Sequence, residues 1–240
     1  MRRIRITVAY DGGPFHGWQT QPGLSTIQGA LEEALAQIEG GPVHVAGSGR
    51  TDAGVHALAQ VAAFSIENPI PVENLRRAAN RLLPHAIRLC SAEEVDAEFQ
   101  PRFHAKAKTY EYRIARGEIC CPFDWPYVHH YPYPLDEGRM AGMARAFEGE
   151  HDFTAFAASD DRDSEGQSKV RTIFSSTVAR AADRLTYRVR GNGFLKHMVR
   201  NLVGTLIEAG RGNIADVAAF PAESGPTAPA KGLFLISVEY

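Results

Sequence analysis

The chain has 240 residues, of which 44% are hydrophobic and 22% are charged, and its formal net charge at pH 7 is −2. This composition is typical of a soluble globular protein, and the charge argues against a uniformly basic protein that binds nucleic acid without specificity. The longest apolar runs are far shorter than the roughly 18 residues of a membrane span, and no apolar segment follows the basic N-terminus as in a signal peptide. We therefore expect a cytoplasmic protein of one large or two small domains.

The first half of the chain predicts the element order β-α-β-β-α-β. Apolar residues alternate over residues 3–10, which indicates a strand. A glycine-rich turn then leads to a helix at about 26–39, where Ser25 and Gln28 have the spacing of a capping box and Gly40 follows the last turn. The remaining expected elements are strands at 43–46, 56–66 and 86–95 and a helix at 72–84. This is the order of a ferredoxin-like unit.

The second half predicts a similar order without an obvious repeat of residues. Alternation places Lys108, Tyr110, Tyr112 and Ile114 on one face of a strand at 106–116. The later expected elements are a helix at 135–147, strands at 170–181 and 184–191, a helix at 194–209 and a strand at 232–240. The predicted fold class is α+β, with two ferredoxin-like or RRM-like halves (residues 1–104 and 105–240) whose mainly antiparallel sheets flank a central cleft.

The segment VHVAGSGRTDAGVHALAQVAAF surrounds Asp52 with Gly47, Gly49 and Gly54 and places Arg50 two residues before it. Glycine loses the most backbone freedom on folding, so these glycines predict a loop that turns sharply or that something approaches closely. An aspartate in such a loop can form an Asx-turn or cap a helix. Alternatively, it is an exposed carboxylate that a nearby guanidinium keeps ionised and that acts as a covalent nucleophile.

Two other residues are candidates for the same site. Arg200 lies beside the apolar stripe of the helix at 194–209, where it either extends to solvent or reaches the cleft and pairs with Asp52. Tyr110 is either a core or cross-strand tyrosine or a platform on which a nucleobase stacks. The three cysteines have neither paired nor metal-binding spacing, so we expect no metal site and no disulfide.

These residues belong to longer motifs that occur in order from the first strand to the last. The motifs are YDGGPFHGWQTQPG, GSGRTDAGVHALAQVAAF, KTYEYRI, CPF, YPYPLD, EGEHDFTAF, RTI, NGFLKHMVRNLVGTL and PTAPAKGLFL. With them the chain resembles the bacterial tRNA pseudouridine synthase A family over nearly its whole length. The segments GRTDAGVHA and FLKHMVRNLVG are the most specific.

The resemblance implies an isomerase that converts uridine to pseudouridine at positions 38–40 in the anticodon stem-loop of tRNA, with no metal or organic cofactor. It makes Asp52 the nucleophile, which attacks either C1′ of the ribose or C6 of the base, and Arg200 its ionic partner. Arg50 would hold the displaced nucleotide or the RNA backbone, and Tyr110 would stack on the target base. The glycines would leave room for the RNA strand. Family members are homodimers, so the resemblance also implies a homodimer.

Two functions of other classes remain open from the sequence. A non-catalytic RNA-binding protein on the same fold would keep its function when alanine replaces Asp52. A hydrolase acting on nucleosides or glycosides would usually need a second carboxylate as general acid or base, and no motif ties one to Asp52. Release of free uracil or sugar would favour the hydrolase.

Overall fold

The structure, a computed structural model, describes residues 1–159 and 168–240, which form two compact units. Unit 1 contains residues 1–106 and 234–240, and unit 2 contains residues 107–233. The strand predicted at the C-terminus thus groups mainly with the first half of the chain. Among the described residues, no helix combines the length and the apolar character that a membrane span requires.

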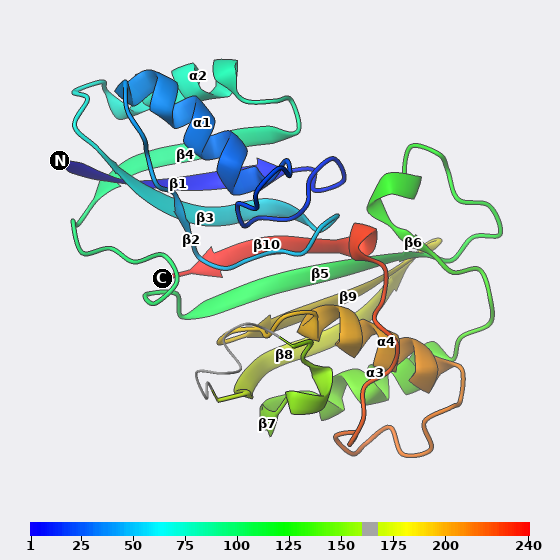
Figure 1. The fold of residues 1–240 in the computed structure, drawn as a ribbon. Helices are drawn as coiled ribbons and strands as arrows, with labels where there is room; N and C mark the ends of the chain where they lie inside the picture. The colour runs from blue at the N-terminus through cyan, green and yellow to red at the C-terminus, as the bar shows by residue number, and fades with distance from the viewer. Residues whose placement is uncertain (160–167) are drawn as a thin grey trace. The chain divides into compact units, whose positions relative to one another are not determined.

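Unit 1 is a sheet with two helices (Figure 1). Its elements are β1 (Arg2–Tyr10), α1 (Ile27–Glu39), β2 (Ala46–Gly47), β3 (His56–Ile66), α2 (Val72–Leu82), β4 (Ile87–Val95) and β10 (Leu233–Glu239). β1 lies between β3 and β4 and is antiparallel to both. β2 is antiparallel to β3, whereas β10 pairs with β3 in parallel. α1 contacts α2, and α2 contacts β4.

The core of unit 1 follows from the alternation along β1. Ile4, Ile6 and Val8 are fully buried on one face, and the residues between them are partly exposed. Leu31 of α1 and Leu75 of α2 are also fully buried. Each such side chain contributes about 1.5–3 kcal/mol when it leaves water. This packing therefore fixes the end of β1, from which the segment next to Asp52 begins.

The start of α1 differs from the capping box predicted with Ser25 and Gln28. Thr26 is the N-cap, because its backbone is extended and its hydroxyl accepts a hydrogen bond from the Gly29 N–H at 3.2 Å. Gln28 lies inside the helix, and its side-chain oxygen accepts from the preceding loop instead. Gly40 ends the helix as predicted, with a left-handed φ of 81°.

Replacing Thr26 with alanine is expected to lower the free energy of unfolding by about 1 kcal/mol, because a partly buried N–H of the first turn loses its acceptor. Ser25→Ala is the matched control, since it removes the neighbouring, exposed hydroxyl. We expect it to change the free energy of unfolding by less than about 0.5 kcal/mol. Urea denaturation measures both values, and a larger loss in Ser25→Ala than in Thr26→Ala would contradict the capping assignment.

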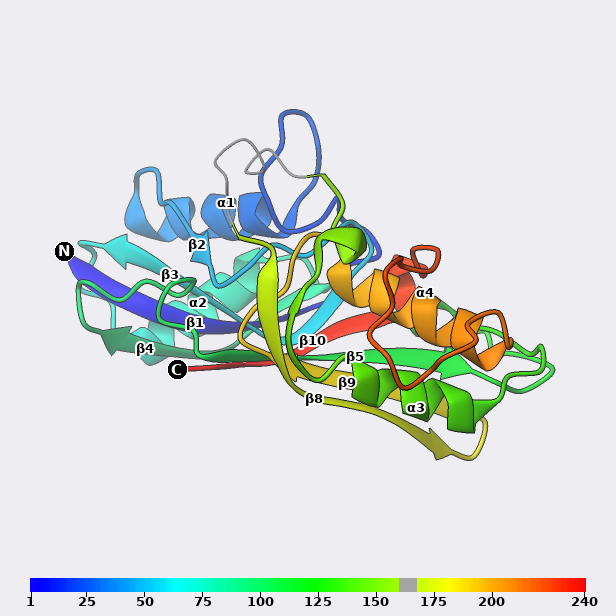
Figure 2. The same cartoon turned by 90° about the horizontal axis from the view of Figure 1, so that it is seen from below.

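Unit 2 also combines β-strands with two α-helices. Its elements are β5 (Ala107–Ala115), β6 (His129–His130), α3 (Glu137–Ala146), β7 (Gly149–Asp152), β8 (Val170–Ala181), β9 (Arg184–Gly191) and α4 (Met198–Gly210). β5, β9, β8 and β7 are antiparallel neighbours in that order, and β6 is parallel to β5. α3 contacts both α4 and β8, and Figure 2 shows the two helices side by side. The predicted α+β class with mainly antiparallel strands is confirmed.

Three elements of unit 2 differ from the sequence prediction, and one of them is the short strand β6, which was not predicted. The helix expected from residue 194 begins only at Met198, after His197, whose backbone is left-handed with φ of 62°. The Lys196 carbonyl accepts a hydrogen bond from the Ala158 N–H at 3.0 Å, so the preceding backbone is engaged outside the helix. β7 was not predicted, because its polar sequence GEHD becomes a strand only by pairing with β8.

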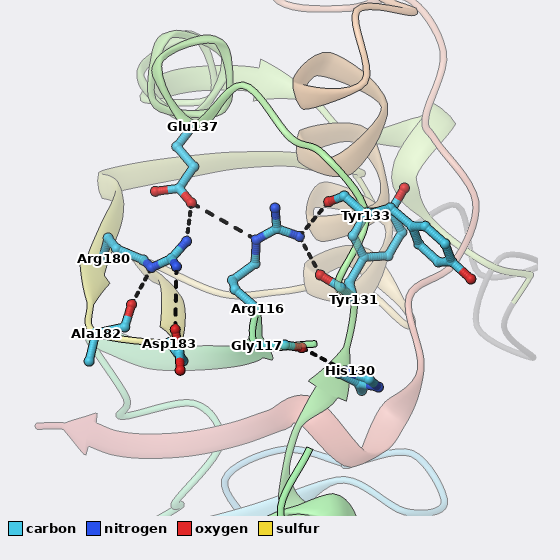
Figure 3. A network of polar contacts seen from close by, with 9 residues as sticks. All are labelled: Arg116, Gly117, His130, Tyr131, Tyr133, Glu137, Arg180, Ala182 and Asp183. Atoms are coloured by element: carbon cyan, nitrogen blue, oxygen red, sulfur yellow. Dashed lines mark hydrogen bonds and ion pairs between the residues drawn. The ribbon is translucent and has the colours of Figure 1, made fainter. Parts of the chain in front are cut away.

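A polar network holds the connector between β5 and α3 (Figure 3). The Arg116 side chain is 8% exposed, and its Nη1 donates to the carbonyls of Tyr131 and, at 2.8 Å, Tyr133. Its Nε lies 3.9 Å from Oε1 of Glu137, which also accepts from Arg180 at 2.5 Å. Burial lowers the pKa of Arg116, and the charge of Glu137 opposes this shift. The network therefore ties the connector to the start of α3 and to the β8–β9 hairpin.

Candidate active site

Asp52 lies in a tight turn between β2 and β3. Its carbonyl oxygen accepts a hydrogen bond from the Val55 N–H at 3.1 Å, and Gly54 at the third position of the turn has φ of 77°. A positive φ at that position of a β-turn requires glycine, which accounts for Gly54. Main-chain atoms thus close the turn, and the Asp52 side chain is partly exposed. Arg50, two residues earlier, is exposed.

The segment 10–18, which begins at the last residue of β1, contacts the residue before Asp52 twice. The Thr51 hydroxyl lies 2.8 Å from the Tyr10 hydroxyl, and the Thr51 carbonyl accepts from the Trp18 N–H at 3.0 Å. Burial raises the pKa of Tyr10, and its hydrogen bonds to Thr51 and Gln60 only partly offset this. Tyr10 therefore stays protonated at neutral pH and can donate to Thr51. Figure 1 shows this segment, in dark blue, near the start of β3.

The residue after the turn is held by the same segment. His56 is 2% exposed, and its Nδ1 lies 3.1 Å from Oδ1 of Asp11 and 3.1 Å from the Gly12 nitrogen, which donates to it. Its ring stacks on Phe234 of β10, with centroids 4.7 Å apart. Both ends of the turn are thus fixed to residues 10–12.

Three glycines make these contacts possible, because a Cβ essentially never comes within 3.0 Å of a heavy atom outside its own and the adjacent residues. An added Cβ would lie 2.7 Å from the Thr51 oxygen at Gly17 and 2.0 Å from the Val55 oxygen at Gly12. At Gly47 it would lie 2.6 Å from the Trp18 ring. The expectation that the glycines near Asp52 leave room for RNA is therefore wrong for Gly47, since an indole ring occupies that space.

Arg200 is held within unit 2 by the segment that follows α4. It lies in the first turn of the helix, and its Nε donates to the Ala228 carbonyl at 2.8 Å while the Ala228 N–H donates to the Arg200 carbonyl at 3.1 Å. At Gly204, an added Cβ would lie 1.7 Å from the Pro226 oxygen. Glycine thus allows the segment to lie directly on α4, and the segment orients the guanidinium group.

Tyr110 lies on β5, on the same face as Tyr112 as predicted. It is 8% exposed, and its ring meets the Phe194 ring edge-on with centroids 5.1 Å apart. The Tyr112 hydroxyl donates to the Pro229 carbonyl at 2.8 Å, next to the carbonyl that Arg200 binds. Burial raises the pKa of Tyr112, and the nearby positive charge of Arg200 offsets this only in part. The hydroxyl therefore stays protonated and can donate. Tyr110 and Arg200 thus belong to unit 2, whereas Asp52 and Arg50 belong to unit 1.

Sequence reasoning missed the residues that hold the Asp52 turn, above all Tyr10, Thr51 and Trp18. The motif YDGGPFHGWQTQPG contained the signal, but its glycines indicated only a turn. The described residues contain no group of three or more His, Cys, Asp or Glu side chains that could hold a metal ion. The structure therefore describes a held carboxylate turn in unit 1 and, separately, an anchored arginine in unit 2.

Comparison with known proteins supports the predicted family. The family model described as tRNA pseudouridine synthase matches residues 6–104 and 143–240. A protein of Solibacter usitatus (strain Ellin6076), named tRNA pseudouridine synthase A, is 78% identical over all of both chains. Proteins of the same name from Lacticaseibacillus casei (strain BL23) and Brevibacillus brevis (strain 47) are 45% and 42% identical, again over 100% of both chains. The chain therefore belongs to the tRNA pseudouridine synthase family and is an isomerase of the pseudouridine synthase A type.

Proposed function

We propose that the protein converts uridine to pseudouridine at positions 38–40 in the anticodon stem-loop of tRNA, with Asp52 as the nucleophile and no metal or organic cofactor. The geometry of the Asp52 turn carries this proposal. Thr51 before the turn and His56 after it are both tied to residues 10–12, so the carboxylate is presented from a fixed backbone. Such preorganisation is what covalent catalysis needs, because the reacting atoms must be held in line.

The reaction exchanges one bond for another within a single nucleotide. The bond between N1 of uracil and C1′ of ribose breaks, a bond between C5 and C1′ forms, C5 loses its proton and N1 gains one. The Asp52 carboxylate attacks either C1′ or C6 and is released at the end, so it acts catalytically. A base paired in a stem must first be flipped out, which costs a few kcal/mol.

The other predicted residues would act around this carboxylate. Arg200, oriented by its hydrogen bond to Ala228, would pair with Asp52 and keep it ionised. Exposed Arg50 would hold the displaced nucleotide or the RNA backbone, and Tyr110 would stack on the target base and assist loss of the C5 proton. The cleft between the halves and the homodimer stay predictions.

Replacing Arg200 with lysine is expected to lower kcat about 10²-fold while the Kd for tRNA stays nearly unchanged. Lysine keeps the charge but lacks the planar group that can bind Ala228 through Nε and a carboxylate through its other nitrogens. Arg211→Lys is the matched control, because Arg211 lies at the end of the same helix and pairs with Glu208 at 2.7 Å. Single-turnover assays and filter binding measure both quantities. Equal kcat values for Arg200→Lys and wild type would contradict the pairing.

The proposed activity is tested by tritium release from tRNA transcribed with 5-tritiated uridine, since formation of the C5–C1′ bond expels the hydrogen on C5. We expect release from tRNA with uridine at position 38, 39 or 40, and none from the same tRNA with cytidine at all three. Release of free uracil would instead support the hydrolase. Binding of tRNA without any release would support a non-catalytic RNA-binding protein.

A further inference from the structure

His16 is an exposed residue within the segment that holds the Asp52 turn. Its backbone is fixed at both polar atoms, because its N–H donates to the Ser25 carbonyl at 2.9 Å and its carbonyl accepts from Gln21 Nε2 at 3.0 Å. The preceding Phe15 is buried, at 6% exposed. The position of His16 is therefore set by the fold, although its ring faces solvent.

The contacts of Gly17 place His16 close to the proposed nucleophile. An added Cβ on Gly17 would lie 3.2 Å from the carbonyl carbon of Asp52. Since consecutive Cα atoms are about 3.8 Å apart, the main chain of His16 lies within roughly 9 Å of that of Asp52. A nucleotide held at Asp52 would bring its adjoining backbone into this neighbourhood.

The His16 ring makes no hydrogen bond or ion pair with the part of the chain that the structure describes. Other histidines of unit 1 are engaged: His56 contacts Asp11, and His44 lies 3.1 Å from a carboxylate oxygen of Glu32. An imidazole ring always carries at least one N–H donor. An exposed donor on a fixed backbone, within roughly 9 Å of the Asp52 main chain, suits a ligand rich in anionic oxygens, and phosphate oxygens are the commonest such acceptors in nucleic-acid complexes.

We propose that His16 donates a hydrogen bond to a phosphate oxygen of the tRNA strand next to the uridine held at Asp52. This rests on the proposed function, because it takes Asp52 as the place where the target uridine binds. The contact is made in the bound substrate and in the transition state alike, so it contributes to binding and not to the chemical step. Loss of such uniform binding raises KM and leaves kcat unchanged.

The test compares three substitutions that separate the donor from the ring. His16→Ala removes both, His16→Phe keeps an aromatic ring without a donor, and His16→Gln keeps an N–H donor without the ring. We expect KM and the Kd for tRNA to rise about tenfold in the alanine and phenylalanine variants and less than about threefold in the glutamine variant. All three should keep kcat within about twofold. His44→Ala, an exposed histidine of the same unit whose side chain is 80% exposed, is the matched control and should change neither value.

Three outcomes would overturn the proposal. Unchanged KM and Kd in His16→Ala would exclude a contact with tRNA. Normal binding by the phenylalanine variant with impaired binding by the glutamine variant would assign His16 to base stacking instead. A fall in kcat at unchanged KM would show that His16 acts on the Asp52 turn. If wild type bound tRNA but released no tritium, the proposed function would fail, and the Kd values would still decide whether His16 contacts RNA.

Discussion

Asp52→Asn is expected to abolish tritium release from tRNA, with a loss of at least about 10⁴-fold in kcat, while the protein stays folded and binds tRNA. Asparagine is nearly isosteric with aspartate but is neutral and cannot act as the attacking carboxylate. The fold should tolerate the change because the turn is closed by the Asp52 carbonyl and the Val55 N–H, which are both main-chain groups. Single-turnover assays with enzyme in excess measure the remaining rate, and filter binding measures the Kd.

The matched control for this variant is Asp96→Asn. Asp96 is an exposed aspartate of unit 1 whose Oδ1 accepts from the Glu98 N–H at 2.8 Å, and an asparagine oxygen can accept the same bond. We expect this control to keep wild-type kcat. If Asp52→Asn retained more than a few per cent of wild-type activity, the carboxylate would not be the nucleophile, and another group would have to form the covalent intermediate.

The elements that sequence reasoning located correctly are those whose pattern reports burial on one face. The alternation of β1 and the glycine at the end of α1 predicted both elements nearly to the residue. Two of the failures occurred at the starts of helices, for different reasons. Thr26 caps α1 although Ser25 has the better motif, and α4 starts late because the Lys196 carbonyl accepts from Ala158, which is distant in sequence. No local pattern contains that information.

The same distinction applies to the site. The glycines around Asp52 correctly predicted a sharp turn and a close approach. Both depend on the backbone conformation and the missing side chain of the glycines themselves. The sequence around Asp52 does not show which group approaches these glycines. Trp18 fills the space at Gly47, and Tyr10 reaches Thr51 across a sequence separation of 41 residues. The motif that contains Tyr10 and Trp18 thus packs against the motif that contains Asp52, and the two form one local structure.

Gly17→Ala tests this link between the two motifs and is expected to lower kcat about 10²-fold while most of the protein stays folded. The added Cβ would lie 2.7 Å from the Thr51 oxygen and 3.2 Å from the Asp52 carbonyl carbon, so the turn must move away. A displacement of about 1 Å at a reacting group costs roughly 10²-fold in rate. Tritium release measures kcat, and circular dichroism at low temperature shows whether the variant is folded.

Gly40→Ala is the control for Gly17→Ala. It distinguishes displacement of the Asp52 turn from the backbone strain that alanine causes at a positive φ. Gly40 also has a positive φ, 81° against 89° at Gly17, but an added Cβ there meets no atom within 4 Å. Both substitutions therefore carry a similar backbone penalty of about 1 kcal/mol in the free energy of unfolding, and only Gly17→Ala pushes on the Asp52 turn. Wild-type kcat is expected for Gly40→Ala. If the two variants lost stability equally and both kept wild-type kcat, the contact between the motifs would serve folding alone, and the position of Asp52 would be set by the tRNA when it binds.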